Sequence, residues 1–305
     1  MKTDKGTLVI LLYHGVTEGI RNGVGNFSGK HIDIKCFEDQ IGLIKKKYTL
    51  LSMDDVVEIY TNGDRWPKNS VAVTFDDGFQ NNYFNAAPIL DKYKCPSTFY
   101  VCAGMINTDL MFWVDIIEDC LNRTKKTAVR IHLAEDAVLY LRDDDEKIQA
   151  IDTVKKYCKK VASPVKDRIL DELIEETDVS PSSDASSDYK MMSWKQLRAI
   201  CDSDLFTVGG HTLYHDIMSA QPVDRMEKDV DTTLSLLEYN LGESMIHFSY
   251  PEGQAHHYSQ EVISALCKKG IVCSPSAIDG FNTDENLFNL KRIMPNFMGR
   301  DFPLS

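Results

Sequence analysis

The sequence lacks any apolar segment long enough to cross a membrane. The apolar run nearest the N-terminus, Leu8-Val-Ile-Leu-Leu-Tyr13, is too short to span a bilayer, and too short for the core of a signal peptide with its cleavage site. A buried first strand is the better interpretation of this run. With no transmembrane segment and no export signal, we expect a protein that works in the cytoplasm.

An excess of positive charge is also absent. The 34 Lys and Arg residues are outnumbered by 46 Asp and Glu residues, and the formal net charge is −12. Because no surplus of Lys and Arg can offset phosphate groups, this balance argues against a general affinity for nucleic acid or for an anionic membrane. It leaves room for a local basic pocket.

Closely spaced cysteine pairs are missing as well. None of the eight cysteines forms a Cys-x-x-Cys pair. In a chain of this size without an export signal, we expect free and mostly buried thiols rather than disulfides.

What the sequence does contain is a repeated alternation of strand and helix patterns. Parallel strands need a crossover between them, so this alternation predicts parallel βαβ units. About seven strands are expected, which favours an α/β barrel or a large parallel sheet. The expected strands lie at 8–13, 71–75, 97–101, 205–208, 245–250, 270–274 and near 289–294.

The stretch from about 105 to 190 interrupts this alternation. It is charged and largely helical in pattern, with candidate helices at 112–121 and within 145–177. We therefore expect a single domain over residues 1–305 that carries an inserted helical subdomain at about 105–190.

Two adjacent carboxylates, Asp76 and Asp77, stand where the strand at 71–75 ends, and Gly78 follows them. Two neighbouring anions repel each other unless a metal ion or a shared proton neutralises one of them. Gly78 permits a backbone turn that could aim both side chains at one place. The alternative is a helix N-terminus with favourable acidic residues, and the doublet alone does not decide between the two.

His211 and His215 are four residues apart, so on one helical turn both imidazoles would lie on the same face. Two histidines and one carboxylate form a three-ligand set of the kind that holds catalytic zinc. The spacing alone is a weak signal, but this pair follows a predicted strand at the same edge as Asp76 and Asp77. The doublet can supply one metal ligand and one general base, which indicates metal-assisted hydrolysis.

Together, Thr74-Phe-Asp-Asp-Gly78 and His211-Thr-Leu-Tyr-His215 resemble the signature of the polysaccharide deacetylases, the NodB-homology or family 4 carbohydrate esterases. Phe248-Ser-Tyr-Pro-Glu-Gly253 is similar to that family's third motif in its FAYPxG form. Tyr13-His14 resembles the N-terminal pair of a branch related to poly-N-acetylglucosamine deacetylases. The resemblance covers about 8–103 and 193–294.

This resemblance implies a distorted (β/α)7-type barrel of the NodB kind and one divalent metal ion, most often zinc, with cobalt, nickel, manganese or iron as alternatives. It implies that Asp77, His211 and His215 hold the metal. Asp76 would then be the general base, and a backbone N–H at Tyr250 would help to stabilise the oxyanion.

A late Leu-x-His motif, which supplies the general acid in many members, is absent here, and Leu290-Lys-Arg292 occupies about its place. By analogy with the related branch, we expect His14 to be the acid. Arg292 is a candidate for the arginine that orients the base. In the Tyr250-Pro251-Glu252 segment, Glu252 could contact substrate. The remaining histidines are expected to be loop or surface residues: His31, His132, His247, His256 and His257.

The predicted function is removal of an N-acetyl group from an amino sugar by a cytoplasmic, metal-dependent hydrolase. Its expected location favours a nucleotide- or lipid-linked intermediate of surface-polysaccharide synthesis as substrate. Two alternatives remain open, a related hydrolase of a linear or cyclic amide and a non-catalytic sugar-binding protein on the same scaffold. The sequence carries no signal for the oligomeric state.

Overall fold

The computed structural model describes residues 6–19 and 23–304. The chain divides into two compact units, which are described separately below. The first, called the sheet unit, comprises Met1–Glu18, Gly29–Thr108 and Met191–Ser305. The second, called the inserted unit, comprises Gly19–Ser28 and Asp109–Lys190.

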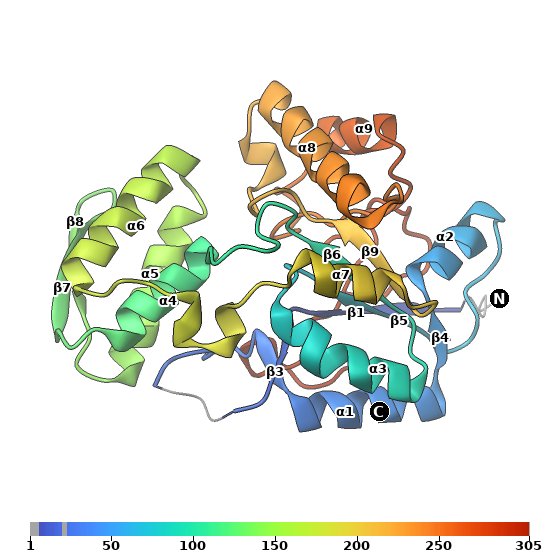
Figure 1. Cartoon of the computed structure of the whole chain (residues 1–305), viewed down its shortest axis with the longest axis horizontal. Helices are drawn as coiled ribbons and strands as arrows, with labels where there is room; N and C mark the ends of the chain where they lie inside the picture. The colour runs from blue at the N-terminus through green and yellow to red at the C-terminus, as the bar shows by residue number, and fades with distance from the viewer. Residues whose placement is uncertain (1–5, 20–22, 305) are drawn as a thin grey trace, which may run out of the picture. The chain divides into compact units, whose positions relative to one another are not determined.

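The sheet unit is built on parallel strands in the order β1-β5-β6-β9, and these strands are labelled in Figure 1. A short strand, β4, pairs with the start of β5. Every residue of β1, β5 and β6 is buried, as expected for a parallel sheet that is covered on both faces. The strands are β1 (Leu8–Tyr13), β4 (Thr49–Leu51), β5 (Ser70–Phe75), β6 (Ser97–Val101) and β9 (Phe206–Gly210), with a separate two-stranded sheet of β2 (Gly15–Thr17) and β3 (His31–Asp33).

Three of the expected strands are not regular strands. The segments 245–250, 270–274 and 289–294 pair with their neighbours only through single bridges, and each is followed directly by a proline. Proline has no N–H to donate to a ladder and therefore cuts the strand short. The parallel bridges join Gly210 to Phe248, His247 to Cys273 and Leu11 to Ile293.

Backbone pairing nevertheless continues from β9 back to β1. The N–H groups of Ser274 and Ser276 donate to the carbonyls of Leu287 and Leu290, which links the second irregular segment to the third. The N–H of Ile293 then donates to the carbonyl of Ile10 in β1. The α/β class is as predicted, and this continuous pairing is consistent with a distorted barrel.

Helices α1, α2, α3, α7, α8 and α9 alternate with the strands and irregular segments of the sheet unit. Ser52 and Ser193 are N-caps, and each forms a capping box, with Asp55 and Gln196 respectively. A π-helical turn over Asn82–Ala86 directly precedes α3. These helices are α1 (Ile34–Lys47), α2 (Met53–Thr61), α3 (Ala87–Tyr93), α7 (Trp194–Cys201), α8 (Val223–Leu241) and α9 (Gln260–Lys268).

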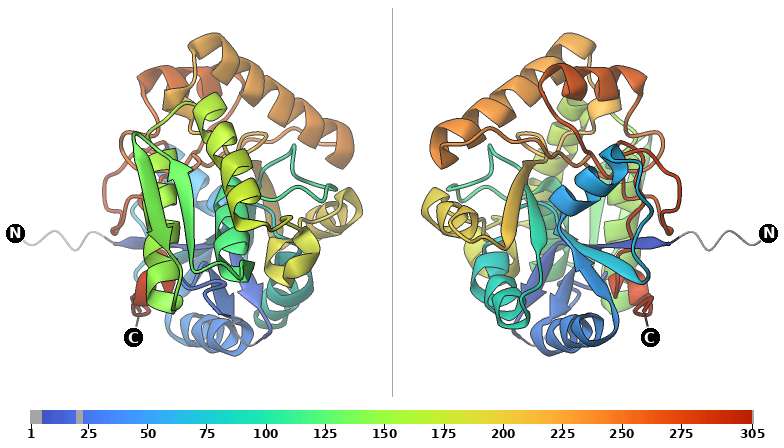
Figure 2. Two further views of the ribbon diagram at one scale, coloured as in Figure 1. Left: turned by 90° about the vertical axis from the view of Figure 1, so that its left-hand side faces the viewer. Right: turned by 90° about the vertical axis from the view of Figure 1, so that its right-hand side faces the viewer.

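The inserted unit is less helical than expected. Besides its helices it contains an antiparallel hairpin of β7 (Ala128–His132) and β8 (Asp136–Tyr140), which packs on α6 and α5 (Figure 2). Only two side chains of β7 are buried, so its alternating pattern was too short to stand out in a charged segment. The main helices of this unit are α4 (Trp113–Arg123), α5 (Asp144–Cys158) and α6 (Ser163–Thr177).

Within 6–19 and 23–304, no helix has both the length and the apolar character required to cross a membrane.

Aromatic rings form the core beneath the end of β5. The ring of Phe75 stacks on that of Phe99 with centroids 4.9 Å apart, and the rings of Tyr13 and Phe37 pack against it. Phe75 is fully buried and directly precedes Asp76. The position of the carboxylate doublet therefore depends on close packing under the last residue of the strand.

We predict that Phe75→Ala lowers the free energy of unfolding by about 3–5 kcal/mol, because it removes a buried ring and leaves a cavity. Urea unfolding of the metal-free protein measures this change. Phe84, which is 57% exposed, offers a matched control, and Phe84→Ala should leave the stability nearly unchanged. Equal effects of the two substitutions would contradict the assignment of Phe75 to the core.

Candidate metal centre and active site

The backbone turns sharply at the carboxylate doublet. Asp76 still pairs with β1 through its N–H, which donates to the carbonyl of Tyr13 at 2.9 Å. Asp77 (φ 78°) and Gly78 (φ 92°) then both adopt left-handed conformations. A Cβ atom at Gly78 would lie only 3.0 Å from the Ile106 side chain, so both the conformation and the space favour glycine there.

His211 and His215 do not lie on a helix, contrary to our prediction. They flank a turn that follows β9, in which Thr212 and His215 both have a φ of 63°. Left-handed residues cannot continue a right-handed helix, so the two imidazoles are brought together by the turn and not by helical periodicity. The carbonyls of Thr212 and Leu213 accept hydrogen bonds from the backbone of the segment after β6, which holds this turn in place.

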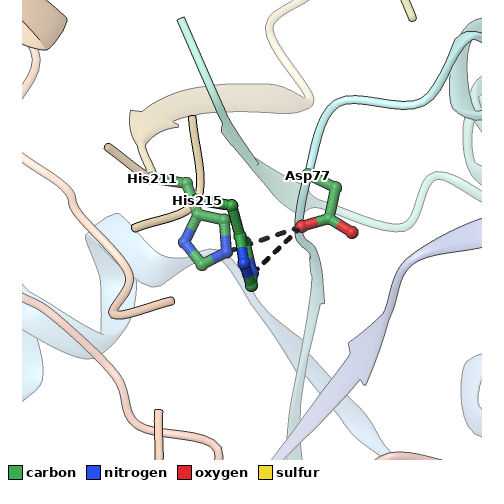
Figure 3. Close-up of side chains that lie close together, drawn as sticks. All are labelled: Asp77, His211 and His215. Carbon is green, nitrogen blue, oxygen red and sulfur yellow. Dashed lines mark ion pairs between the residues drawn. The ribbon is translucent and has the colours of Figure 1, made fainter. Parts of the chain in front are cut away.

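The side chains of Asp77, His211 and His215 converge at this edge of the sheet (Figure 3). One ligand atom from each lies within 4.8 Å of the other two. Asp77 Oδ1 is 3.6 Å from Nε2 of each histidine. Ligand atoms of a tetrahedral zinc site with bonds of about 2.0–2.1 Å are about 3.3 Å apart, so these residues fit a small divalent cation.

His211 has the protonation pattern that a metal ligand needs. Its Nδ1 is 2.8 Å from the carbonyl oxygen of Ser249. A carbonyl only accepts, so Nδ1 carries the hydrogen and Nε2 presents a lone pair toward Asp77. Burial lowers the pKa of His211, and nearby Asp76 only partly offsets this effect. The imidazole is therefore uncharged near neutral pH.

Asp76 forms an ion pair with a buried arginine at the border of this ligand set. Arg292 Nη1 and Nη2 donate to the two carboxylate oxygens at 2.8 and 2.7 Å, a bidentate ion pair. Burial on its own would raise the pKa of Asp76, but Arg292 and His211 outweigh it, and the pKa lies below its usual value. Asp76 Oδ2 is 3.9 Å from His211 Nε2. The structure thus places an ionised carboxylate at the border of the ligand set, next to the arginine suggested by the sequence.

His14 lies close to the same centre. Its charge interacts with those of Asp76, His211 and Arg292, and its Nδ1 is buried with no hydrogen-bond partner among the described residues. Burial lowers the pKa of His14 to about 3, although Asp76 acts in the opposite direction. The imidazole is therefore uncharged at neutral pH in the metal-free protein.

The Tyr250-Pro251-Glu252 segment begins directly after Ser249. The Tyr250 side chain is buried, stacks on Tyr258 with centroids 4.1 Å apart, and donates its hydroxyl to the carbonyl of Phe288. Glu252 adopts a left-handed conformation with a φ of 58°. Its negative charge partly opposes the lowering of the His211 pKa by burial. Glu252 is therefore near the metal-ligand set, whereas the ring of Tyr250 is part of the core.

Three other histidines are buried, although they were expected in loops or at the surface. His31, His247 and His257 are 3%, 0% and 6% exposed. His247 lies in the irregular segment 245–250 and hydrogen-bonds to Asp54 at the start of α2, with 2.7 Å between its Nε2 and Oδ1 of Asp54. Their burial follows from long-range packing, which local polarity does not report. His132 and His256 are exposed as expected.

Asp229 was missed by the sequence analysis. Its Oδ1 accepts hydrogen bonds from the backbone N–H of Leu213, inside the histidine turn, and from the Thr233 hydroxyl. Burial raises the pKa of Asp229 to about 6. Asp229 lies on the same face of α8 as the buried residues Met226, Val230 and Thr233. A carboxylate on a buried helical face needs a partner, and this position could have identified Asp229 from the sequence.

The fold and the site together define a class of protein. Its members have an α/β sheet, and at the edge of the sheet an Asp-His-His set that can hold a metal lies beside a second aspartate paired with an arginine. The sequence model of the family described as "Polysaccharide deacetylase" matches residues 63–273. The chain belongs to this polysaccharide deacetylase family.

Individual relatives are more distant. Poly-beta-1,6-N-acetyl-D-glucosamine N-deacetylase of Staphylococcus aureus (strain MSSA476) is 30% identical over 128 residues, 38% of this chain and 43% of the relative. A putative polysaccharide deacetylase of Bacillus subtilis, YxkH, is 28% identical over 108 residues, 35% of this chain and 36% of the relative. The chain thus matches less than half the length of these curated relatives.

Solved structures show the same fold over nearly the whole chain. The structure of IcaB from Ammonifex degensii has a TM-score of 0.62 at 18% identity, covering 95% of this chain and 92% of that chain. The Streptococcus pyogenes deacetylase PplD has a TM-score of 0.62 at 16% identity, covering 95% and 93%. At such identities the likeness is one of fold.

We predict that the purified protein binds one equivalent of zinc and that His211→Ala abolishes this binding, because a three-ligand site cannot lose a ligand and retain its affinity. Elemental analysis after dialysis and chelator competition measure the stoichiometry and the Kd. His132→Ala, an exposed histidine of the inserted unit, is the matched control and should bind zinc normally. Stoichiometric zinc in His211→Ala would contradict the ligand assignment.

We predict that Asp229→Ala weakens zinc binding by about 10- to 100-fold, the usual effect of losing a residue that orients metal ligands. Asp229→Asn should retain most of the affinity, because an amide oxygen can still accept the hydrogen bond from Leu213. Competition with a chromogenic chelator measures both Kd values. If Asp229→Ala bound zinc as tightly as the wild type, the histidine turn would not depend on this contact.

Proposed function

We propose that the protein is a metal-dependent deacetylase that hydrolyses the N-acetyl group of an amino sugar. The observation that carries this proposal is the division of the two aspartates, Asp77 toward His211 and His215 and Asp76 toward Arg292. Family membership supports the reaction class. In this proposal, Asp77 and the two histidines hold the metal and Asp76 is the general base.

A divalent cation at the ligand set would supply Lewis acidity toward the acetyl carbonyl and would lower the pKa of a water molecule. The residues of the chain supply the proton transfers. Asp76 is ionised and borders the ligand set, so it can accept the proton of the attacking water. Arg292 keeps this carboxylate in place before and after the transfer. The backbone N–H of Tyr250 is our candidate for a hydrogen bond to the oxyanion.

His14 is our candidate for the acid that protonates the leaving amine. Because its pKa is about 3 in the metal-free protein, it does not carry this proton in the resting state. The proton has to reach His14 during the reaction, and the carboxylate of Asp76, which raises the pKa of His14, is the nearby group that has just gained one. Asp76 and His14 would then act as base and acid in sequence.

The proposal also covers the kind of molecule that carries the N-acetylated sugar. We propose a cytoplasmic enzyme that acts on a nucleotide- or lipid-linked N-acetylated sugar, an assignment that rests on the expected location. The printed name of the Staphylococcus aureus relative, an N-deacetylase of poly-beta-1,6-N-acetyl-D-glucosamine, favours a second candidate, a β-1,6-linked polymer. Both candidates carry the N-acetyl group on an amino sugar.

Acetate release by the zinc-loaded protein distinguishes these candidates. Three probes are compared: a nucleotide-linked N-acetylglucosamine, a β-1,6-linked N-acetylglucosamine pentamer and a cyclic imide. Faster turnover of the nucleotide sugar would support our proposal, and faster turnover of the pentamer would replace it with the polymer. Turnover of the imide alone would overturn the deacetylase assignment.

We predict that Asp76→Asn retains zinc but lowers kcat by about 10²- to 10⁴-fold, the usual contribution of a general base. An amide of nearly the same shape cannot accept the proton, whereas the ligands Asp77, His211 and His215 are unchanged. Metal content and acetate release are measured on the same preparation. Wild-type turnover by Asp76→Asn would rule out Asp76 as the base.

We predict that wild-type stability falls relative to that of His14→Gln as the pH decreases from 6.5 toward 4. The unfolded chain protonates His14 near its ordinary pKa of about 6.5, whereas the folded protein does so only near a pKa of about 3. Acidification therefore favours the unfolded state of the wild type in this interval. Urea unfolding of both metal-free proteins measures the difference, and parallel pH curves would contradict the burial of an uncharged His14.

A further inference from the structure

Ser249 lies where the metal-ligand set and the Asp76–Arg292 pair meet. It is fully buried, and its N–H donates to the carbonyl of Gly210 at 2.9 Å, which fixes it beside the end of β9. Its carbonyl oxygen is 2.8 Å from His211 Nδ1. Its hydroxyl oxygen is 3.2 Å from Asp76 Oδ2 and 3.0 Å from Arg292 Nη2. A single residue therefore contacts both halves of the site.

The direction of each hydrogen bond follows from the groups involved. A guanidinium N–H can only donate, so the Ser249 hydroxyl oxygen accepts from Arg292. The single hydroxyl hydrogen is then available for Asp76 Oδ2. This oxygen consequently receives two donors, one from Arg292 and one from Ser249, whereas Oδ1 receives Arg292 Nη1. The carboxylate is held from two different side chains.

We propose that Ser249 is a positioning residue that sets the Asp76 carboxylate relative to His211, through its hydroxyl on one side and its carbonyl on the other. This inference rests on the proposed function, in which Asp76 is the base. Serine stands where the FAYPxG form of the motif has alanine, which has no hydroxyl. The contact with Asp76 is therefore an addition to that form of the motif.

The two contacts of Ser249 can be separated by mutation. Ser249→Ala removes the hydroxyl but retains the carbonyl that orients His211. At a fully buried position no solvent is at hand to replace the lost donor, so Asp76 Oδ2 loses one of its hydrogen bonds. The substitution should therefore affect the base and leave the metal ligand oriented.

The kinetic test uses the zinc-loaded protein and whichever of two probes the wild type deacetylates faster, the nucleotide-linked N-acetylglucosamine or the β-1,6-linked N-acetylglucosamine pentamer. We expect Ser249→Ala to lower kcat about tenfold, the usual effect of a hydrogen bond to a charged group, with KM and the zinc Kd nearly unchanged. Ser97→Ala, which removes another buried hydroxyl at the start of β6, should retain wild-type kcat. A wild-type kcat in Ser249→Ala, or a matching loss of zinc affinity, would overturn the proposal.

A second readout needs no substrate. In urea unfolding of the metal-free protein, Ser249→Ala should lower the midpoint in the wild-type background and lower it much less in an Asp76→Ala background, because the hydroxyl then has no carboxylate to hold. Asp76→Leu, whose side chain also has no hydrogen-bond acceptor, replaces Asp76→Ala if the latter does not fold. Ser97→Ala should have the same effect in both backgrounds. Additive effects of Ser249→Ala and Asp76→Ala would overturn the proposal.

The two readouts separate this inference from the proposed function. If the wild type releases no acetate from the nucleotide sugar or the pentamer, the deacetylase assignment fails. The unfolding measurements still decide whether the Ser249 hydroxyl holds Asp76, since they depend only on the contact between the two residues.

Discussion

The bidentate ion pair of Arg292 with Asp76 is the interaction on which the site depends most. Removing a guanidinium from water is costly, and the fold offsets this cost by giving each nitrogen a partner: Nε donates to the carbonyl of Ser276, and both Nη atoms reach Asp76. Arg292 belongs to the irregular segment 289–294, and Asp76 directly follows β5. The pair therefore ties the C-terminal part of the sheet unit to its centre, and it lowers the pKa of Asp76.

The sequence was sufficient to predict the residues of the metal-ligand set but not the way in which the chain presents them. Asp77, His211 and His215 stood out because strand ends of parallel sheets share one edge, and the structure brings them together. The helical turn inferred from the spacing of His211 and His215 was wrong. A four-residue spacing suits a tight turn as well as a helix, and nothing in the residue types revealed the left-handed conformations.

Features that depend on distant parts of the chain escaped prediction. Ser249 and Asp229 form hydrogen bonds with residues 173 and 16 positions away in sequence, and no local pattern encodes such contacts. The capping boxes at Ser52 and Ser193 were predictable because both partners lie within three residues. The interruption of the last strands was visible in the prolines that follow them, although the strand patterns themselves suggested regular pairing.

Asp77, Thr212, His215 and Glu252 are all non-glycine residues with positive φ, and all lie in the loops around the ligand set. Each such conformation costs on the order of 1 kcal/mol or more, most of all for the β-branched Thr212. Glycine would relieve the strain at Asp77 or His215 but would remove a ligand atom. The strained conformations of these loops lower the stability of the fold and orient the side chains toward the site. A search for stabilising substitutions would therefore select against function at these positions.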